Sequence, residues 1–511
     1  MSHKLNRREF LKLTGLLPLS YYIPHLILKP ESFLQGGKGK NVIIVVFDAF
    51  SARNISFHGY QRETTPNLTR LAERATVYHN HYSGSNFTYP GTAALLTGTY
   101  PWTNRGFSPF IGIDQAYSEK NIFKLFNQHY RVIYTHNPVA QLLMKEFNTH
   151  IDKFKHRQEL FLGHDLISDL LFRNDEDIAS VSWAQAMIRE GNRSTYSLFL
   201  SHLYNWYNQG KIEEFAEIFP RGIPNIRNDN FFLLEDAIDW IKEKAAQLPQ
   251  PFLGYFHFLP PHDPYFTRID FTDAFKVDGF EPIEKPEHLF TQGRTYIESR
   301  KDRLWYDEFI LFVDAEFGRL YNDLATNGIL DNTWLIFTSD HGEMFERGFT
   351  KHYNESLHQP VIQIPLLIFE PGGQTRKDVL TPTSAVDLLP TLLQITDQEI
   401  PDWCEGEVLP PYNSSEPDPD RSIFALEAKK NKMYQPVNSA TAMIVKGQYK
   451  LTYYFGYEKL NGRGPLIELY DIQNDPEELE NLFETRTSIT NELLDELLAK
   501  LQAADAPYSS G

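Results

Sequence analysis

The chain has 511 residues, of which 41% are hydrophobic and 23% charged, as in an ordinary globular protein. Its formal net charge of −18 excludes nucleic acid as a partner, because phosphate backbones require a basic surface, and disfavours adhesion to anionic lipid head groups. The single cysteine, Cys404, excludes an internal disulfide, and we expect it to be a buried residue without a catalytic role.

The N-terminus has the layout of an export signal, in which basic residues precede an apolar run. Residues 6–12 (NRREFLK) resemble a twin-arginine signal, and residues 13–28 are mostly apolar but too few to span a bilayer. We therefore expect residues 1–40 to be an export signal or N-terminal anchor with a linker. The protein would then be periplasmic or otherwise extracytoplasmic, touching the membrane only through this segment if it is retained. A disordered basic tail is the alternative.

Strand and helix patterns alternate through the next part of the chain, which predicts a doubly wound, mainly parallel α/β sheet. Short apolar runs without alternation are typical of strands that are buried on both faces. In chain order we expect a strand at 41–47, helices at 66–75, 87–96, 121–126 and 236–246, a strand at 251–258, a helix at 306–325, and strands at 334–338 and 365–369.

Two segments depart from this alternation. Residues of about 141–228 are rich in aromatic and charged side chains and predict a helical insertion beside the site. After a Pro/Ser/Asp-rich boundary near 410–420, the patterns predict a smaller C-terminal α+β subdomain over 411–511. Its expected elements are strands at 443–445, 449–454 and 466–470 and a helix at 488–503, so the large domain covers 41–410.

Candidate site residues follow two of the predicted strands and start one helix. Asp48 comes directly after the first strand, and Asp340 and His341 follow the third, where open α/β sheets place their chemistry. Thr88 opens a helix, where free backbone N–H groups attract anions. A divalent cation shared by the acids would acidify this hydroxyl and reverse the local charge for an anionic substrate. Taken singly, such residues also serve as helix caps and turn residues.

Several ordered segments together resemble the sulfatase-like branch of the alkaline phosphatase superfamily, almost end to end. They are NVIIVVFDAF, GYQRETTPNLTRLAE, TYPGTAALLTGTYP, FHFLPPHDPY, GILDNTWLIFTSDHGE, AVDLLPTLL, YKLTYYF and LIELYDIQNDPEELENL. The resemblance implies a doubly wound catalytic domain with a small C-terminal sheet and helix. It also implies that Asp48, Thr88, Asp340 and His341 bind the metal and that Thr88 is the nucleophile.

The resemblance further assigns basic residues to the substrate. His262 falls in a Pro-His-x-Pro element, where the imidazole contacts the anionic group or the leaving oxygen, although a histidine there also caps the turn. Lys351 and His352 match the basic pair that follows Asp-His-Gly-Glu, with His358 as a competing match. We expect His262 and His352 to act in catalysis, and Lys351 and His358 to bind substrate.

Two departures from the family pattern shape the expected reaction. True sulfatases have Cys or Ser followed by x-Pro-Ser-Arg, and convert the first residue to formylglycine, which threonine cannot become. The residues here read Thr88-Tyr89-Pro90-Gly91-Thr92. Family members with threonine in this position transfer phosphoryl groups. Where many sulfatases carry a second aspartate, this chain has Ala49, which leaves two acids, one imidazole and the threonine oxygen and favours Mn²⁺ or Zn²⁺, with Ca²⁺ as the alternative. The further Asp and His ligands of a two-zinc site are not evident, so we expect one divalent metal ion.

The leading hypothesis is therefore a metal-dependent hydrolase of phosphate mono- or diesters that uses a threonine nucleophile, with phosphotransfer to an alcohol as a second outcome. The expected substrate is an anionic small-molecule, glycan or lipid-headgroup ester. One alternative is a sulfuric-ester hydrolase that works without formylglycine. The other is a catalytically inactive binding protein of the same fold.

Overall fold

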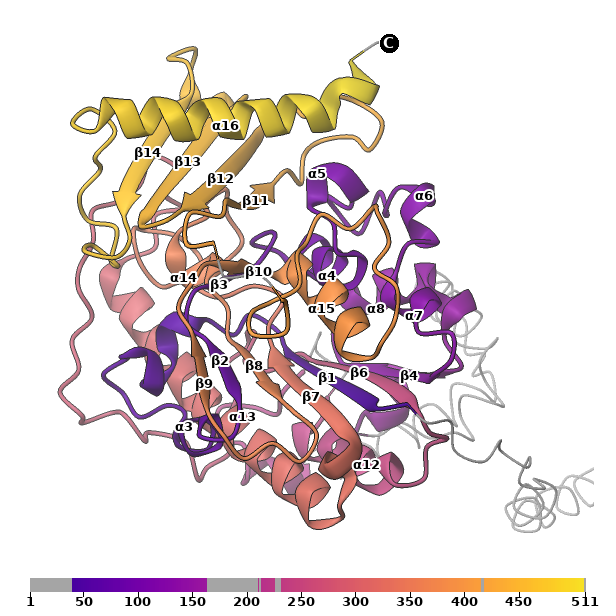
Figure 1. Cartoon of the computed structure of the whole chain (residues 1–511). Coiled ribbons are helices and arrows are strands. Elements are labelled where there is room, and N and C mark those ends of the chain that lie inside the picture. The colour runs from indigo at the N-terminus through magenta and orange to yellow at the C-terminus, as the bar shows by residue number, and fades with distance from the viewer. Residues whose placement is uncertain (1–38, 163–209, 211–212, 226–230, 415–417, 510–511) are drawn as a thin grey trace, which may run out of the picture. The chain divides into compact units, whose positions relative to one another are not determined.

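The computed structural model describes residues 39–162, 210, 213–225, 231–414 and 418–509 (Figure 1). The predicted export signal and most of the predicted insertion at 141–228 lie outside these residues, so both stay predictions. In the ranges described, no helix combines the length and apolarity that a bilayer span requires.

Eight strands of the described chain form one sheet in the order β5-β4-β6-β1-β7-β8-β2-β9. Strand β8 runs antiparallel to both of its neighbours, and every other neighbouring pair is parallel, which confirms the predicted mainly parallel sheet. The strands are β1 (Asn41–Phe47), β2 (Thr76–Tyr78), β4 (Tyr130–Thr135), β5 (Lys153–Lys155), β6 (Phe252–Phe258), β7 (Thr333–Thr338), β8 (Leu366–Phe369) and β9 (Lys377–Val379).

Alternate residues of β1 enter two different hydrophobic cores, which explains why this strand is apolar throughout. Ile43 and Val45 pack with residues of α3, α12 and α13, whereas Ile44 and Val46 pack with residues of α4, α8 and α15. Both faces of the sheet are therefore covered by helices, as expected of a doubly wound fold. These helices are α3 (Pro66–Ala72), α4 (Thr88–Thr97), α8 (Pro138–Glu146), α12 (Leu234–Ala245), α13 (Tyr296–Thr326) and α15 (Leu388–Ile395).

Most predicted elements agree with the structure to within a few residues, and two differences have a local cause. Helix α13 begins at Tyr296 rather than Tyr306, because Thr295 and Glu298 form a reciprocal capping box that starts the helix earlier. Strand β5 lies within residues 141–228, where the sequence predicted a mostly helical insertion. Its three residues, two of them lysines, are too few to give a strand pattern. The remaining short helices are α5 (Pro101–Asn104), α6 (Gln115–Ser118), α7 (Ile122–Leu125) and α14 (Gln359–Ile362).

The C-terminal part is a four-stranded antiparallel sheet in the order β11-β12-β13-β14, with helix α16 (Thr487–Asp505) lying across one face (Figure 1). The strands are β11 (Ile423–Glu427), β12 (Ala440–Lys446), β13 (Tyr449–Phe455) and β14 (Leu466–Asp471), and a two-stranded pair joins β3 (His81–Tyr82) to β10 (Thr383–Ser384). This sheet shares a core with the α4–α5 region, where Trp102 packs on Phe424. The smaller subdomain is thus an α+β unit, as predicted.

The lone cysteine is half-buried rather than fully buried. Burial raises the pKa of the Cys404 thiol to about 12, so the sulfur is protonated and unreactive at neutral pH.

Candidate functional site

Polar side chains from four neighbouring strands meet at the carboxyl edge of the large sheet. Asp48 follows β1, Asp340 and His341 follow β7, His257 lies near the end of β6, and Asn137 comes just after β4. Because β4, β6, β1 and β7 are adjacent and parallel, their carboxyl ends share one edge, which brings together residues far apart in sequence.

The two aspartates and two histidines form a fully buried cluster. His341 Nε2 lies 3.4 Å from Asp48 Oδ1 and 3.7 Å from Asp340 Oδ2, and His257 Nε2 lies 3.6 Å from the same Asp340 oxygen. Within the described residues, Asp48 Oδ1, Asp340 Oδ2 and His257 Nε2 have no hydrogen-bond partner. Buried carboxylate oxygens without partners are costly, and a divalent cation at this cluster would satisfy them.

The charges of this cluster also favour a cation. Burial and the neighbouring Asp340 both raise the pKa of Asp48, which shows that a second negative charge is unfavourable there. For Asp340, burial alone would raise the pKa, but the neighbouring His341 and His257 lower it below its ordinary value. His341 Nδ1 lies 2.9 Å from the carbonyl oxygen of Gly342 and donates to it, so the lone pair of Nε2 points toward the two carboxylates.

Thr88 completes the group that the sequence predicted. It is the first residue of α4, and its Oγ1 lies 3.3 Å from His341 Nε2. Phe87, which precedes it, provides no side-chain cap, so the first N–H groups of this ten-residue helix stay available to an anion. The structure therefore brings Asp48, Thr88, Asp340 and His341 together.

Asn137 is a site residue that the sequence analysis missed. Its Oδ1 accepts hydrogen bonds from the N–H groups of Val139 and Ala140 and caps α8, while its Nδ2 donates to Asp48 Oδ2 and lies 3.5 Å from Thr88 Oγ1. An Asn-Pro pair after a strand predicts a helix cap, which is correct here, but nothing in that pattern predicts the contact with Asp48. His257 was missed as well, because a histidine between two phenylalanines of a buried strand looks like a core residue.

The predicted substrate-side residues line one flank of the cluster. The ring of His352 lies 4.4 Å from that of His341 and 5.0 Å from that of His262, measured between ring centroids. His352 Nδ1 lies 3.0 Å from Glu343 Oε1, and His352 Nε2 is among the buried atoms without a partner in the described chain. Lys351 Nζ pairs with Asp263 Oδ2 at 2.9 Å. Tyr353 was not predicted, and its hydroxyl lies 3.0 Å from His262 Nε2.

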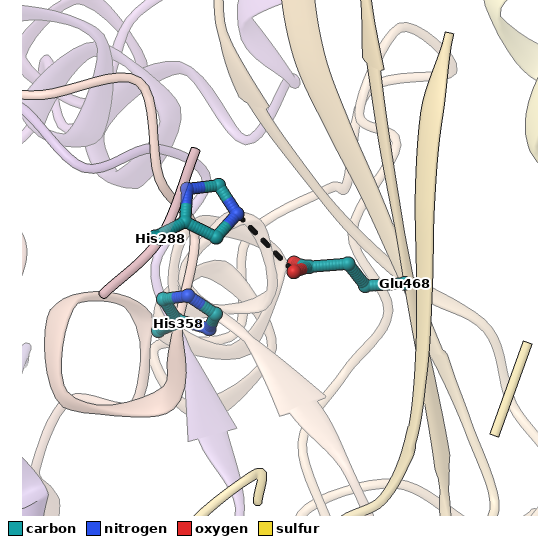
Figure 2. Close-up of side chains that lie close together, drawn as sticks. All are labelled: His288, His358 and Glu468. Atoms are coloured by element: carbon teal, nitrogen blue, oxygen red, sulfur yellow. Dashed lines mark hydrogen bonds and ion pairs between the residues drawn. The ribbon is translucent and has the colours of Figure 1, made fainter. Parts of the chain in front are cut away.

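His358, the alternative match for the basic pair, lies in another cluster. It is buried beside His288 and Glu468, at the base of the C-terminal sheet (Figure 2). His288 Nδ1 accepts the backbone N–H of Phe290, so Nε2 carries the ring proton and donates it to Glu468 Oε1 at 3.1 Å. Burial alone would raise the pKa of Glu468, but the bond from His288 and the nearby His358 lower it to about 2.

Within this second trio His288 and Glu468 are hydrogen-bonded to each other, whereas both ring nitrogens of His358 lack a hydrogen-bond partner in the described chain. A cation between His288 and Glu468 would have to displace the proton that His288 donates, and Nδ1 is held as an acceptor by the backbone of Phe290. The structure places His358 against the ring of His288 and 3.4 Å from Glu478 Oε2, and does not group it with His262, His341 and His352. Its contact with substrate stays a prediction.

Comparison with known proteins gives two family matches. The profile described as Sulfatase matches residues 40–398, and the one described as N-sulphoglucosamine sulphohydrolase, C-terminal, matches residues 343–505. Arylsulfatase K of Canis lupus familiaris is 24% identical over 481 residues, covering 86% of this chain and 78% of its own. Choline-sulfatase of Rhizobium meliloti (strain 1021) is 24% identical over 476 residues, with 87% and 82% covered.

Solved structures share the fold. A phosphonate monoester hydrolase of Agrobacterium radiobacter superposes with a TM-score of 0.62 at 19% identity, covering 91% of this chain and 95% of its own. The structure of BT4656 in complex with its substrate D-glucosamine-2-N,6-O-disulfate gives a TM-score of 0.62 at 17% identity, with 93% and 99% covered.

Proposed function

The chain belongs to the sulfatase family, and on that premise we propose that this hydrolase cleaves phosphate mono- or diesters with Thr88 as the nucleophile. The observation that carries the proposal is the place of the Thr88 hydroxyl, 3.3 Å from His341 Nε2. The same nitrogen lies 3.4 Å from Asp48 Oδ1 and 3.7 Å from Asp340 Oδ2. A threonine side chain cannot become the formylglycine aldehyde, so the group that reacts at this position is a hydroxyl.

We assign one divalent cation to Asp48, Asp340, His341 and the Thr88 oxygen, with Mn²⁺ or Zn²⁺ favoured by the imidazole. His257 also lies close enough to both aspartates to share a metal ion with them. When bound, such an ion supplies positive charge that acidifies a hydroxyl and stabilises the charge of a transferring group. The partnerless Asp48 Oδ1 and Asp340 Oδ2 support this assignment.

In the proposed reaction, Thr88 Oγ1 attacks phosphorus, a new O–P bond forms, and the bond to the leaving alcohol breaks. Burial and the neighbouring His341 lower the pKa of His352, so its imidazole is neutral at pH 7. With Nδ1 directed at Glu343, its free Nε2 is suited to accept a proton from the attacking hydroxyl or water. His262, which contacts Tyr353, gives a proton to the leaving oxygen.

Water then attacks the phosphorus on Thr88 and restores the hydroxyl, releasing phosphate when the substrate is a monoester and a phosphate monoester when it is a diester. If an alcohol takes the place of water, the same intermediate gives phosphotransfer. Asn137 supports both steps, because its donation to Asp48 favours the ionised carboxylate.

A second candidate function is sulfuric-ester hydrolysis by unmodified threonine. It is favoured by the two curated relatives, whose names are arylsulfatase K and choline-sulfatase. A catalytically inactive binding protein is the third reading. We keep as proposals an anionic small-molecule, glycan or lipid-headgroup substrate, and export directed by residues 1–40.

The deciding experiment compares kcat/KM on an aryl phosphate monoester, an alkyl aryl phosphodiester and an aryl sulfate, after EDTA treatment and reloading with Mn²⁺ or Zn²⁺. The proposal expects metal-dependent hydrolysis of a phosphate ester that exceeds hydrolysis of the sulfate. Thr88→Ala should lower kcat by at least about a thousandfold, Thr88→Ser should keep activity, and Thr69→Ala, at an exposed threonine of α3, should have no effect. A preference for the aryl sulfate would instead establish the second candidate, and no turnover of any ester would favour the third.

A further inference from the structure

Lys429 brings a positive charge from the C-terminal sheet to the catalytic cluster. It lies just after β11, and its ammonium sits 5.1 Å from the ring centroid of Phe87, the residue that precedes Thr88. The same Nζ lies 3.4 Å from the carbonyl oxygen of Asn354, in the loop that carries His352. Lys429 therefore lies between the segment of the nucleophile and the segment of the substrate-side histidine.

The charge of Lys429 is only weakly paired. The nearest carboxylate oxygen given for it is Glu427 Oε1 at 4.0 Å, whereas Lys351 Nζ lies 2.9 Å from Asp263. Both carboxylate oxygens of Glu427 accept other hydrogen bonds: Oε1 from the backbone N–H of Lys429 at 3.1 Å, and Oε2 from the hydroxyl of Tyr457. An ammonium has three N–H donors, so Lys429 keeps hydrogen-bonding capacity for a ligand.

The side chain is also accessible to a ligand, with 27% of its surface exposed. A half-buried cation with a weak partner is unfavourable in the free protein, and an anion beside it would recover that cost.

We propose that Lys429 is a substrate-binding residue whose ammonium binds an ionised non-bridging oxygen of the ester's phosphate or sulfate group. The C-terminal sheet thereby completes the anion site, and Lys429 selects esters whose reacting group is charged. This assignment rests on the proposed function only for whether the reacting atom is phosphorus or sulfur, because the Lys429 ammonium would bind a phosphate oxygen and a sulfate oxygen alike.

The test is the binding of inorganic phosphate and of inorganic sulfate to the metal-loaded full chain, measured by calorimetry. Lys429→Met keeps the apolar stem against Phe87 but removes the charge, and should weaken binding of the preferred anion at least about tenfold. Lys429→Arg should restore most of the affinity. Lys430→Met is the matched control, because Lys430 is 69% exposed and faces Glu355 at 3.6 Å, and it should change affinity less than about twofold.

Equal anion affinity in wild type and Lys429→Met would overturn the proposal, as would an equal loss in Lys430→Met or the absence of binding by either anion in the wild type. The phosphate and sulfate arms show which anion the site prefers. Since the experiment follows binding and not turnover, loss of phosphoesterase activity would count against the proposed function and not against Lys429.

Discussion

Asn137 is a residue whose single side chain serves both the fold and the site. Its oxygen caps α8, and its amide nitrogen donates to Asp48, so substitution should have two separable effects. Loss of the cap should cost about 1 kcal/mol of unfolding free energy. Loss of the donor removes a hydrogen bond that lowers the pKa of Asp48 and leaves its charged form less favourable.

We therefore expect Asn137→Ala to lower kcat/KM at least about tenfold as well as stability. Asn121→Ala is the matched control, because Asn121 caps α7 through a bond to the N–H of Lys124. Its stability loss should be similar, but its kcat/KM should stay at the wild-type value. Equal kinetic losses in both variants, measured alongside urea denaturation, would mean that Asn137 acts only through the fold.

The raised pKa of Asp48 predicts that the stabilisation of the fold by a metal ion depends on pH. Burial and Asp340 raise the pKa of Asp48 in the folded, metal-free chain above its value in the unfolded chain. The protonated carboxyl therefore stabilises the fold below the ordinary carboxyl pKa, and this stabilisation is lost as the pH rises through the raised pKa of the folded chain. A cation binds the ionised form and offsets this loss. The increase in Tm on adding Mn²⁺ should therefore grow from about pH 5 to about pH 8. An increment that is constant with pH, or that survives in Asp48→Asn, would contradict the role of Asp48.

At the scale of elements, helix α4 is held against the end of β7 at Gly91. A Cβ added there would overlap the carbonyl oxygen of Asp340 and approach Ser83 Oγ at 3.3 Å, so the helix that carries Thr88 could not stay in place. Gly91→Ala would gain about 1 kcal/mol of helix propensity, but the clash involves backbone and should outweigh that gain.

We expect Gly91→Ala to lower kcat at least about a hundredfold and to lower the Tm. Gly210→Ala, where a Cβ meets no atom of the described residues within 4 Å, should change neither quantity. Wild-type kcat in Gly91→Ala would show that the distance between Thr88 and the acids is not critical.

The strands also show which parts of the fold and of the site could be predicted from sequence patterns. The apolar runs of β1 and β7 end at Asp48 and at Asp340–His341, so both the strands and the position of these candidates were predictable. Strand β4 could not be predicted, because it begins half-exposed and contains Arg131, whose guanidinium pairs with Asp152 at 2.7 Å. The contact of Asn137 with Asp48 depends on the adjacency of β4, β6 and β1, which no local pattern encodes.

At the scale of the whole molecule, buried charges join the C-terminal sheet to the loops around the catalytic cluster. Lys450 of β13 pairs with Glu478, and both side chains are fully buried. Glu478 also accepts the backbone N–H of Gln359, and Arg347 donates to its carbonyl oxygen. A sequence predicts neither contact, because each partner belongs to a different part of the chain.

Glu478→Gln would leave the buried charge of Lys450 without the carboxylate that it is hydrogen-bonded to, and should cost about 3–5 kcal/mol of unfolding free energy. The double variant Lys450→Met with Glu478→Gln should lose less than the single one. The partly exposed Lys446–Glu496 pair, which joins β12 to α16, is the control, and Glu496→Gln should have little effect. Denaturant unfolding that places the two single variants at the same midpoint would rule out this role for the buried pair.

The central claim, a phosphoryl group carried by Thr88, is tested most directly by the stereochemistry at phosphorus. Hydrolysis by the metal-loaded chain of an aryl phosphorothioate monoester made chiral with two oxygen isotopes, in water that carries the third isotope, should proceed with net retention of configuration. Transfer to Thr88 and then to water is two in-line displacements, each of which inverts the phosphorus. Net inversion would mean that water attacks the ester directly, and it would contradict the role assigned to Thr88.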